Sequence, residues 1–431
     1  MKKSKFIKST IILLIGGFIT KILGMLIKII TTRLLGTEGI GIYMLLTPTF
    51  SLFIAIAQLG FPVAISKLVA EDTKNNKSLV FSIIPIAILI NILLLFGIFI
   101  SSNFISNTLL HEPRTKIAIM CIGFVLPFIS ISSIIRGYFF GKEKMIPHVL
   151  SNVIEDIVRM IILVLGIPIF IKNGLEFAVA FLILSNIISE LTSIVILLFF
   201  LPKNFKLEKK DCIPNKQNIK DIFSISLPTT GSRLVGNIGY FFEPIILTST
   251  LLWVGYDNNF IITEYGIISG YVMPLLLLPS FFTMAISQAL IPIISKSTAK
   301  RNYKYAKDKL KQAIFFSLLI GIPITIIFEI IPEIPLRLIY NTTEGISYIR
   351  ILAPICLLHY IQSPLSSTLQ AMGKAKDALK GTLVGILLRT SSLFIFSSLK
   401  IGMWGLVIAT SINIIYVTLY DASRIKKYLN T

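Results

Sequence analysis

A small number of charged side chains interrupt the long apolar stretches of this chain, and their types suit them to chemistry. Lys21 and Lys28 lie seven residues apart in the first stretch, and Arg233 lies in the seventh. Seven residues span two helical turns, so the two lysines share one face of a helix. Ammonium and guanidinium groups bind phosphate and carboxylate. These three residues therefore predict a site for an anion.

Acidic residues accompany these cations. Glu155 and Arg159 are four residues apart, which is the spacing of an ion pair along one helix. Glu190 has no such neighbour, so it either pairs with Arg159 from another helix or titrates. Glu243 either balances a nearby cation, titrates or forms a structural ion pair. With Arg389, which lies near the middle of its stretch, Glu190 and Glu243 are candidates for charge balance or ion coupling.

The alternative for each basic residue is a side chain that extends to the membrane surface. Lys28 and Arg136 lie close enough to the ends of their stretches to do so, whereas Lys21 and Arg233 are more central. A charge at the centre of a bilayer costs about 3 kcal/mol on insertion scales. The central cations are therefore the stronger candidates for a functional cavity.

Composition places these charges in a membrane. Of the 431 residues, 54% are hydrophobic and 14% are charged, whereas a soluble domain carries about 25% charged residues. We predict an all-α polytopic membrane protein, because twelve stretches are long enough to cross ~30 Å of hydrocarbon. They lie near 9–32, 40–66, 79–101, 117–140, 149–171, 177–201, 222–253, 266–295, 313–331, 349–371, 379–399 and 402–420.

The basic residues orient the chain. Of its 41 lysines and arginines, 28 lie in the segments on one side of a twelve-span topology and 6 on the other. This asymmetry predicts a cytoplasmic membrane protein with both termini in the cytoplasm. It also explains the net charge of +20 without nucleic-acid binding, since basic loops contact anionic lipid headgroups.

Several other classes of protein are disfavoured. The chain has no Walker A motif, no histidine cluster and no Ser/His/Asp arrangement, and its three cysteines are not spaced as a disulfide framework or metal site. We therefore expect neither an enzyme nor a metal centre or cofactor. The opening MKKSKFIKSTIILLIGG resembles a signal peptide, but no cleavage site follows, so we interpret it as a retained first span.

The chain divides into two halves that repeat. A basic cytoplasmic linker over 202–221 separates a six-helix lobe over 1–201 from a second over 222–431. Short matches recur in order at equivalent spans: TKILG with SRLVG, PVAISK with PIISK, and GKEK with GKAK. Because each half has an even number of spans, the halves insert the same way round, as in transporters built from parallel repeats. Lys21 and Arg233 occupy equivalent positions and would converge if the first and seventh spans face each other.

Longer motifs carry a family resemblance over essentially the whole chain. The segments RLLGTEGIGIYMLLTPTF, LGFPVAISKLVAE and SISLPTTGSRLVGNIGYFFEPIIL resemble the stage V sporulation protein B group. That group belongs to the polysaccharide branch of the multidrug/oligosaccharidyl-lipid/polysaccharide (MOP) flippase superfamily, in which the MATE transporters and, more distantly, the MurJ lipid II flippases also lie.

The resemblance implies two six-helix lobes around a cavity that opens to one side at a time. It implies a polyprenyl-pyrophosphate-linked glycan as cargo, with lipid II for spore cortex or wall peptidoglycan as the leading candidate. Lys21 matches a cavity arginine of the MurJ-like proteins, and Arg33 matches a second basic residue of that span. Two features depart from the family: this chain has twelve spans instead of fourteen, and Tyr271 to Leu278 is uncharged.

The sequence thus predicts a flippase that works by alternating access, in the cell membrane or the forespore membrane. Membrane potential, H⁺ or Na⁺ would bias its cycle. Flipping of another lipid-linked polysaccharide, such as a teichoic acid or capsule unit, stays open as an alternative. So does a non-transporting scaffold whose partners are cell-wall synthases. A drug-cation antiporter is disfavoured, because the predicted cavity is basic.

Overall fold

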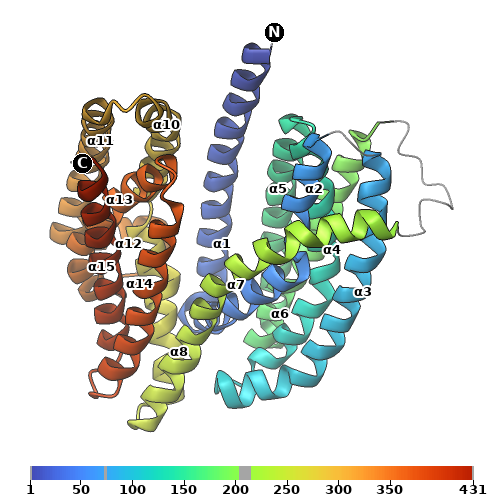
Figure 1. The fold of residues 1–431 in the computed structure, drawn as a ribbon. Helices are drawn as coiled ribbons and strands as arrows, with labels where there is room; N and C mark the ends of the chain where they lie inside the picture. Colours follow the sequence, from blue (N-terminus) through green and yellow to red (C-terminus); the bar gives the residue numbers. More distant parts are fainter. Residues whose placement is uncertain (1, 72–74, 203–214, 430–431) are drawn as a thin grey trace. The chain divides into compact units, whose positions relative to one another are not determined.

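The structure is a computed structural model that describes residues 2–71, 75–202 and 215–429 (Figure 1). All the regular secondary structure in those ranges is helical. The all-α part of the prediction is confirmed. The chain forms two compact units, Met1–Phe241 and Phe242–Thr431, which are described separately below. The predicted linker over 202–221 lies partly outside the described residues, and its last part is already helical.

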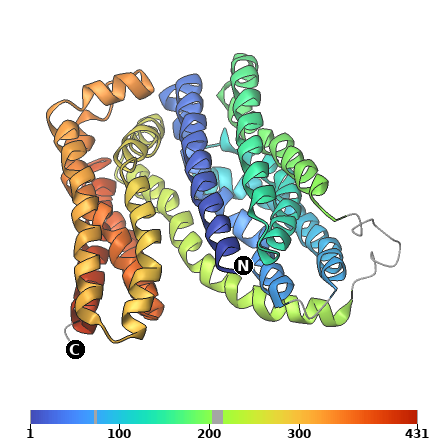
Figure 2. The ribbon, with the colours of Figure 1, turned by 90° about the horizontal axis from the view of Figure 1, so that it is seen from above.

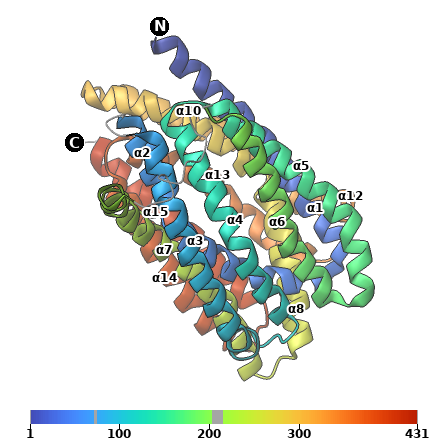
Figure 3. The ribbon, with the colours of Figure 1, turned by 90° about the vertical axis from the view of Figure 1, so that its right-hand side faces the viewer.

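The first unit is built around α4, which packs against α1, α2, α3 and α6, while α5 packs on α1 and α6. Figure 3 shows α3, α4 and α6 side by side. The helices of this unit are α1 (Lys2–Gln58), α2 (Phe61–Glu71), α3 (Asn76–Asn103), the π-helix η1 (Phe104–Leu109), α4 (Thr115–Gly141), α5 (Met145–Phe170), the 3₁₀ turn η2 (Ile171–Asn173), α6 (Leu175–Phe199) and the first part of α7 (Lys216–Trp253).

Two glycines mark breaks in the region where the sequence predicts the first two spans. At 57 residues, α1 is nearly three times the length that crosses a bilayer, and it kinks at Gly36, whose φ is 69°. The predicted span over 40–66 is also broken, because α1 ends at Gln58 and α2 begins after Gly60. Gly60 has a φ of 66°, a backbone conformation that glycine adopts without strain.

The short helix α2 contributes to an apolar core that also fixes the start of α7. Phe61 and Ile65 of α2 are fully buried among residues of α3, α4 and α6, together with Ile222 of α7. The Phe61 ring meets Phe223 edge-on, with the ring centroids 5.7 Å apart. Ile222 and Phe223 therefore anchor the beginning of α7 to the first unit.

The second unit is organised around α13, which packs against α10, α11 and α15, while α14 packs on α15. Figure 2 shows α10 and α11 as an antiparallel hairpin. After the end of α7, the unit contains α8 (Asn258–Gly266), the π-helix η5 (Ile267–Val272), α9 (Met273–Leu276), α10 (Ser280–Ala299), α11 (Tyr303–Ile330), α12 (Glu333–Tyr340), α13 (Ile346–Ala371), α14 (Ala375–Ser397) and α15 (Trp404–Leu429).

The eighth predicted span, 266–295, is not one straight helix. The segment Asn258–Leu276 and α10 meet at an angle of 49° across a short break. Pro279 directly precedes α10, and Pro274 opens α9. Proline cannot donate the backbone hydrogen bond that would continue the preceding helix, which accounts for a break at this place.

The helices are consistent with twelve crossings. Within the described ranges, eight helices are long and apolar enough to cross a membrane, and the bent pair counts as a ninth. The first of the eight contains both predicted N-terminal spans. The remaining two, α5 and α13, are each 26 residues long but are not among these nine.

We predict that Gly60→Ala destabilises the first unit. A Cβ atom at Gly60 would lie 2.7 Å from the carbonyl oxygen of Ser226 on α7, and the positive φ adds backbone strain. Together these should lower the free energy of unfolding by about 1–3 kcal/mol. Thermal unfolding of the detergent-solubilised protein would measure the loss.

The matched control is Gly97→Ala in α3, where a Cβ atom would meet no described atom within 4 Å. This control should leave the melting temperature unchanged or slightly higher, since alanine favours a helix. Equal melting of the two variants would show that the close approach at Ser226 does not constrain this turn.

Candidate functional site

A cluster of buried charges connects α4, α5 and α6 in the first unit. Arg136 of α4 binds Glu155 of α5 through Nη2, and the same nitrogen lies 2.7 Å from Ser193 Oγ and 3.5 Å from Glu190 Oε2 on α6. Arg159 Nη2 donates to Glu155 Oε1 at 2.7 Å. Two guanidinium groups thus face two carboxylates between α4, α5 and α6.

The geometry of this cluster differs in part from what the sequence suggests. The Glu155 and Arg159 side chains are in contact one helical turn apart, at the spacing from which the pair is predicted. Arg136, however, does not extend to the membrane surface: its side chain is 18% exposed and turns toward Glu155 and Glu190. Glu190 therefore contacts Arg136. Burial favours this arrangement, because each carboxylate needs a cation where water is absent.

We predict that Arg136→Gln strongly destabilises the first unit. The substitution leaves Glu155 with Arg159 alone and removes the arginine that lies within ion-pair distance of Glu190. An uncompensated buried charge costs about 3–5 kcal/mol. Arg136→Gln/Glu190→Gln should recover part of the loss. Lys67→Gln, which removes an exposed charge of the same unit, is the matched control for thermal unfolding. If Arg136→Gln melts like this control, the cluster does not stabilise the unit.

A second buried ion pair lies in the second unit. Arg389 Nη2 of α14 is 2.7 Å from Glu243 Oε2 near the end of α7, and it also lies 3.4 Å from Thr410 Oγ1 of α15. The Glu243 side chain is buried, whereas that of Arg389 is partly accessible. The structure thus brings together two residues that the sequence singles out for charge balance or coupling.

The cations Lys21 and Arg233, in contrast, have exposed side chains. Among the described residues, neither side chain forms a hydrogen bond or an ion pair, and the two are not in contact with each other. Lys28 is half-buried. The convergence of these cations on one cavity stays a prediction.

Open space borders the helix faces that carry these cations. Gly17 and Gly24 lie on the same stripe of α1 as Lys21, and a Cβ atom at either glycine would meet no described atom within 4 Å. The same holds for Gly231 and Gly236, which flank Arg233 on α7. The glycines beside both cations are therefore not packed against other described residues. By contrast, Gly16, on another face of α1, lies against Val149 of α5.

A third group of charges, which sequence reasoning missed, joins the α1 kink to the start of α4. Arg114 donates to Glu112 through Nε at 2.7 Å and Nη2 at 3.2 Å, and to Glu38 Oε1 through Nη1 at 2.6 Å. The hydrogen bonds to Glu112 and Glu38 raise the pKa of the Arg114 guanidinium above its usual range. Glu38 and Arg114 are far apart in sequence, so no spacing signal could have paired them.

In the part of the chain that the structure describes, no group of three or more His, Cys, Asp or Glu side chains is arranged to hold a metal ion. Cys121 and Cys356 are buried free thiols, and Cys212 lies outside the described residues. The polar groups available for binding are therefore the cations of α1 and α7 and the charge pairs of each unit.

Solved structures place this arrangement in a known fold. An inward-facing conformation of a multidrug resistance MATE family transporter of the MOP superfamily superposes with a TM-score of 0.76, at 17% sequence identity, over 95% of each chain. A MatE family model matches residues 265–395. The chain is thus an all-α, multi-pass membrane protein with the fold of a MATE transporter, as the sequence predicts.

Sequence comparisons define the family more closely. A model described as polysaccharide biosynthesis protein matches residues 6–298. Stage V sporulation protein B of Bacillus subtilis (strain 168) is 35% identical over 100% of this chain and 85% of that relative. The lipid II flippase MurJ of the same organism is 22% identical over 99% of this chain and 83% of that relative. The chain belongs to the polysaccharide biosynthesis protein family, and the resemblance found in its motifs is confirmed.

Proposed function

We propose that this protein is a flippase that moves a polyprenyl-pyrophosphate-linked glycan across the cytoplasmic membrane by alternating access, with lipid II as the expected cargo. The observation that carries the proposal is a MATE fold in which Lys21 of α1 and Arg233 of α7 are exposed and have no ion-pair partner among the described residues. The chain is also similar along its whole length to a lipid II flippase. The similarity to stage V sporulation protein B suggests the forespore membrane as one setting.

The chemistry of the cations suits the pyrophosphate group of such a cargo. The Arg233 guanidinium can hold two phosphate oxygens at once, and the Lys21 ammonium supplies a compact charge with three donors. Lys28, two turns from Lys21 on the same face, would assist. The sugar part of the cargo would lie in the open space beside these side chains, while the prenyl chain stays in the lipid.

The pairing of the acidic residues supports an anionic cargo. Glu155, Glu190 and Glu243 each lie within 3.5 Å of an arginine, so these carboxylates are already balanced. Lys21 and Arg233 are left as uncompensated positive charges among the described residues. A site with this balance attracts phosphate and repels cationic drugs.

We expect Lys21→Ala/Arg233→Ala to abolish most transport. Each charge-assisted contact contributes about 1.5–3 kcal/mol, so losing two should weaken cargo binding by at least about 100-fold. The measurement is the amount of lipid II accessible at the outer leaflet of cells depleted of other flippases, at matched expression. Lys67→Ala/Lys172→Ala is the control, because it removes two exposed charges from the same unit.

Each result of this experiment decides something different. Restoration by the wild type and the control, but not by the double variant, supports both the cargo and the site. Equal restoration by all three keeps the flippase and rejects Lys21 and Arg233 as its anion site. If the folded wild type restores no lipid II, that cargo is rejected.

We propose further that the Glu243–Arg389 pair couples transport to protons, since protonation of Glu243 would release Arg389. Dissipating the proton gradient should slow outer-leaflet delivery by the wild type and by Glu71→Gln, an exposed control. Glu243→Gln, which resembles the protonated carboxyl, should deliver at a rate that no longer depends on the gradient. A Glu243→Gln protein that still responds would reject Glu243 as the coupling group. A wild type that does not respond would shift coupling to Na⁺ or the membrane potential.

A second candidate cargo is another lipid-linked polysaccharide, such as a teichoic acid or capsule unit. The family model favours it, because its description specifies polysaccharide biosynthesis without naming lipid II. Such a glycan carries the same polyprenyl pyrophosphate and would use the same cations. Delivery of that glycan in the assay above, with lipid II unaffected, would identify it.

The non-transporting scaffold that recruits cell-wall synthases makes a different prediction. Loss of activity after changes to the basic loops alone would favour it.

A further inference from the structure

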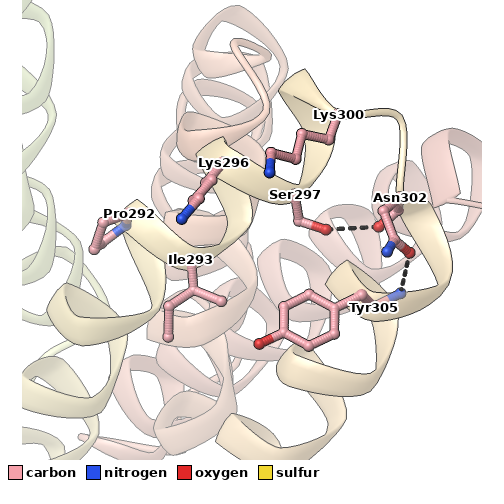
Figure 4. A pocket seen from close by; sticks show the side chains of 7 residues that line it. All are labelled: Pro292, Ile293, Lys296, Ser297, Lys300, Asn302 and Tyr305. Carbon is pink, nitrogen blue, oxygen red and sulfur yellow. Dashed lines mark hydrogen bonds between the residues drawn. The ribbon is translucent and has the colours of Figure 1, made fainter.

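A cavity opens at the end of the α10–α11 hairpin, entirely within the second unit. Its volume is about 520 Å³, and it lies between the last turns of α10 and the first turn of α11 (Figure 4). The residues that line it are Pro292, Ile293, Lys296, Ser297, Lys300, Asn302 and Tyr305. None of them belongs to the proposed flippase site.

Two lysines give this cavity its charge. Lys296 lies in the last turn of α10 and Lys300 directly follows the helix, and Figure 4 shows their side chains on the same side. Both are exposed, and among the described residues neither has a hydrogen-bond or ion-pair partner. The segment 296–312 contains seven basic residues and a single acidic one, Asp308, which does not line the cavity.

The neutral polar groups of the cavity also present donors. Ser297 Oγ donates to the Asn302 carbonyl at 2.6 Å, and Asn302 Oδ1 accepts from the Tyr305 backbone N–H at 3.0 Å. Both oxygens of Asn302 are thus occupied, which leaves its amide Nδ2 as a donor. Together with the Tyr305 hydroxyl and the two ammonium groups, the cavity offers donors to an anion, and no carboxylate is among the seven lining residues.

The apolar side of the cavity distinguishes a lipid from a soluble anion. Pro292 and Ile293 lie one turn before Lys296, toward the apolar body of α10, and the Ile293 side chain is exposed. Along the chain, the residues that can contact hydrocarbon therefore come before the residues that carry positive charge. A phospholipid has the same order, from its acyl chains to its phosphate, and basic pockets on the cytoplasmic side bind such headgroups.

We propose that this cavity binds the phosphate of an anionic phospholipid headgroup, with Lys296 and Lys300 as the charged contacts. The acyl chains would lie against Pro292 and Ile293. The Asn302 amide and the Tyr305 hydroxyl would donate to the remaining phosphate or headgroup oxygens. The site would lie at the membrane face that the distribution of lysine and arginine predicts to be cytoplasmic, and it is independent of the proposed cargo.

The test is a titration of the delipidated full-length protein in detergent with phosphatidylglycerol, followed by native mass spectrometry. Lys296→Gln/Lys300→Gln should weaken the tightest lipid-binding event roughly 30-fold, because each lysine near a membrane surface contributes about 1 kcal/mol. Lys304→Gln/Lys311→Gln is the matched control, since it removes two exposed charges of the same basic segment outside the cavity. This control should bind like the wild type.

Further arms identify the source of the phosphate and guard against misfolding. Excess inorganic phosphate should not displace phosphatidylglycerol; displacement would make this a soluble-anion site and overturn the lipid assignment. Equal weakening in both double variants would reduce binding to general surface attraction and overturn the site. Lys296→Arg/Lys300→Arg keeps the charge and should retain binding, and its loss of binding despite an unchanged melting temperature would also contradict the proposal.

Discussion

The absence of water from the membrane interior is the constraint on which this structure depends. A charge there must meet an opposite charge or open onto a wet space. Arg136 and Arg159 satisfy Glu155 and Glu190 in the first unit, and Arg389 satisfies Glu243 in the second. Lys21 on α1 and Arg233 on α7 are different, because no opposite charge contacts either of them among the described residues. The proposed binding of an anion follows from that difference between paired and unpaired charges.

The sequence predicts those features of the molecule that depend on local pattern. The apolar stretches predict the helices, and the four-residue spacing of Glu155 and Arg159 predicts their contact. Contacts between helices were not predictable in this way: Arg136 meets carboxylates 19 and 54 residues away, and no periodicity links them. The break before α2 was missed for a similar reason, because the turn at Gly60 is set by its close approach to Ser226 on another helix.

We assign two roles to the basic segment 296–312, one in orientation of the chain and one in lipid binding. The lysines and arginines of 296–312 contribute to the charge asymmetry from which the orientation of the chain is predicted, and two of them also line the cavity at the end of the α10–α11 hairpin. Orientation needs only positive charge near the membrane end of a helix. Binding needs donors in a defined geometry beside an apolar wall, which the hydrogen bonds of Asn302 help to fix.

The position of Arg136 has a consequence for the synthesis and membrane insertion of the protein. A ribosome makes α4 before α5 and α6, so this arginine is synthesised before either of its carboxylates. Glu155 follows after 19 residues and Glu190 after 54. Until then α4 carries an unmatched charge that opposes its release into lipid by about 3 kcal/mol. Packing of α5 and α6 against α4 removes this cost, so the charge of α4 is matched only when all three helices are together.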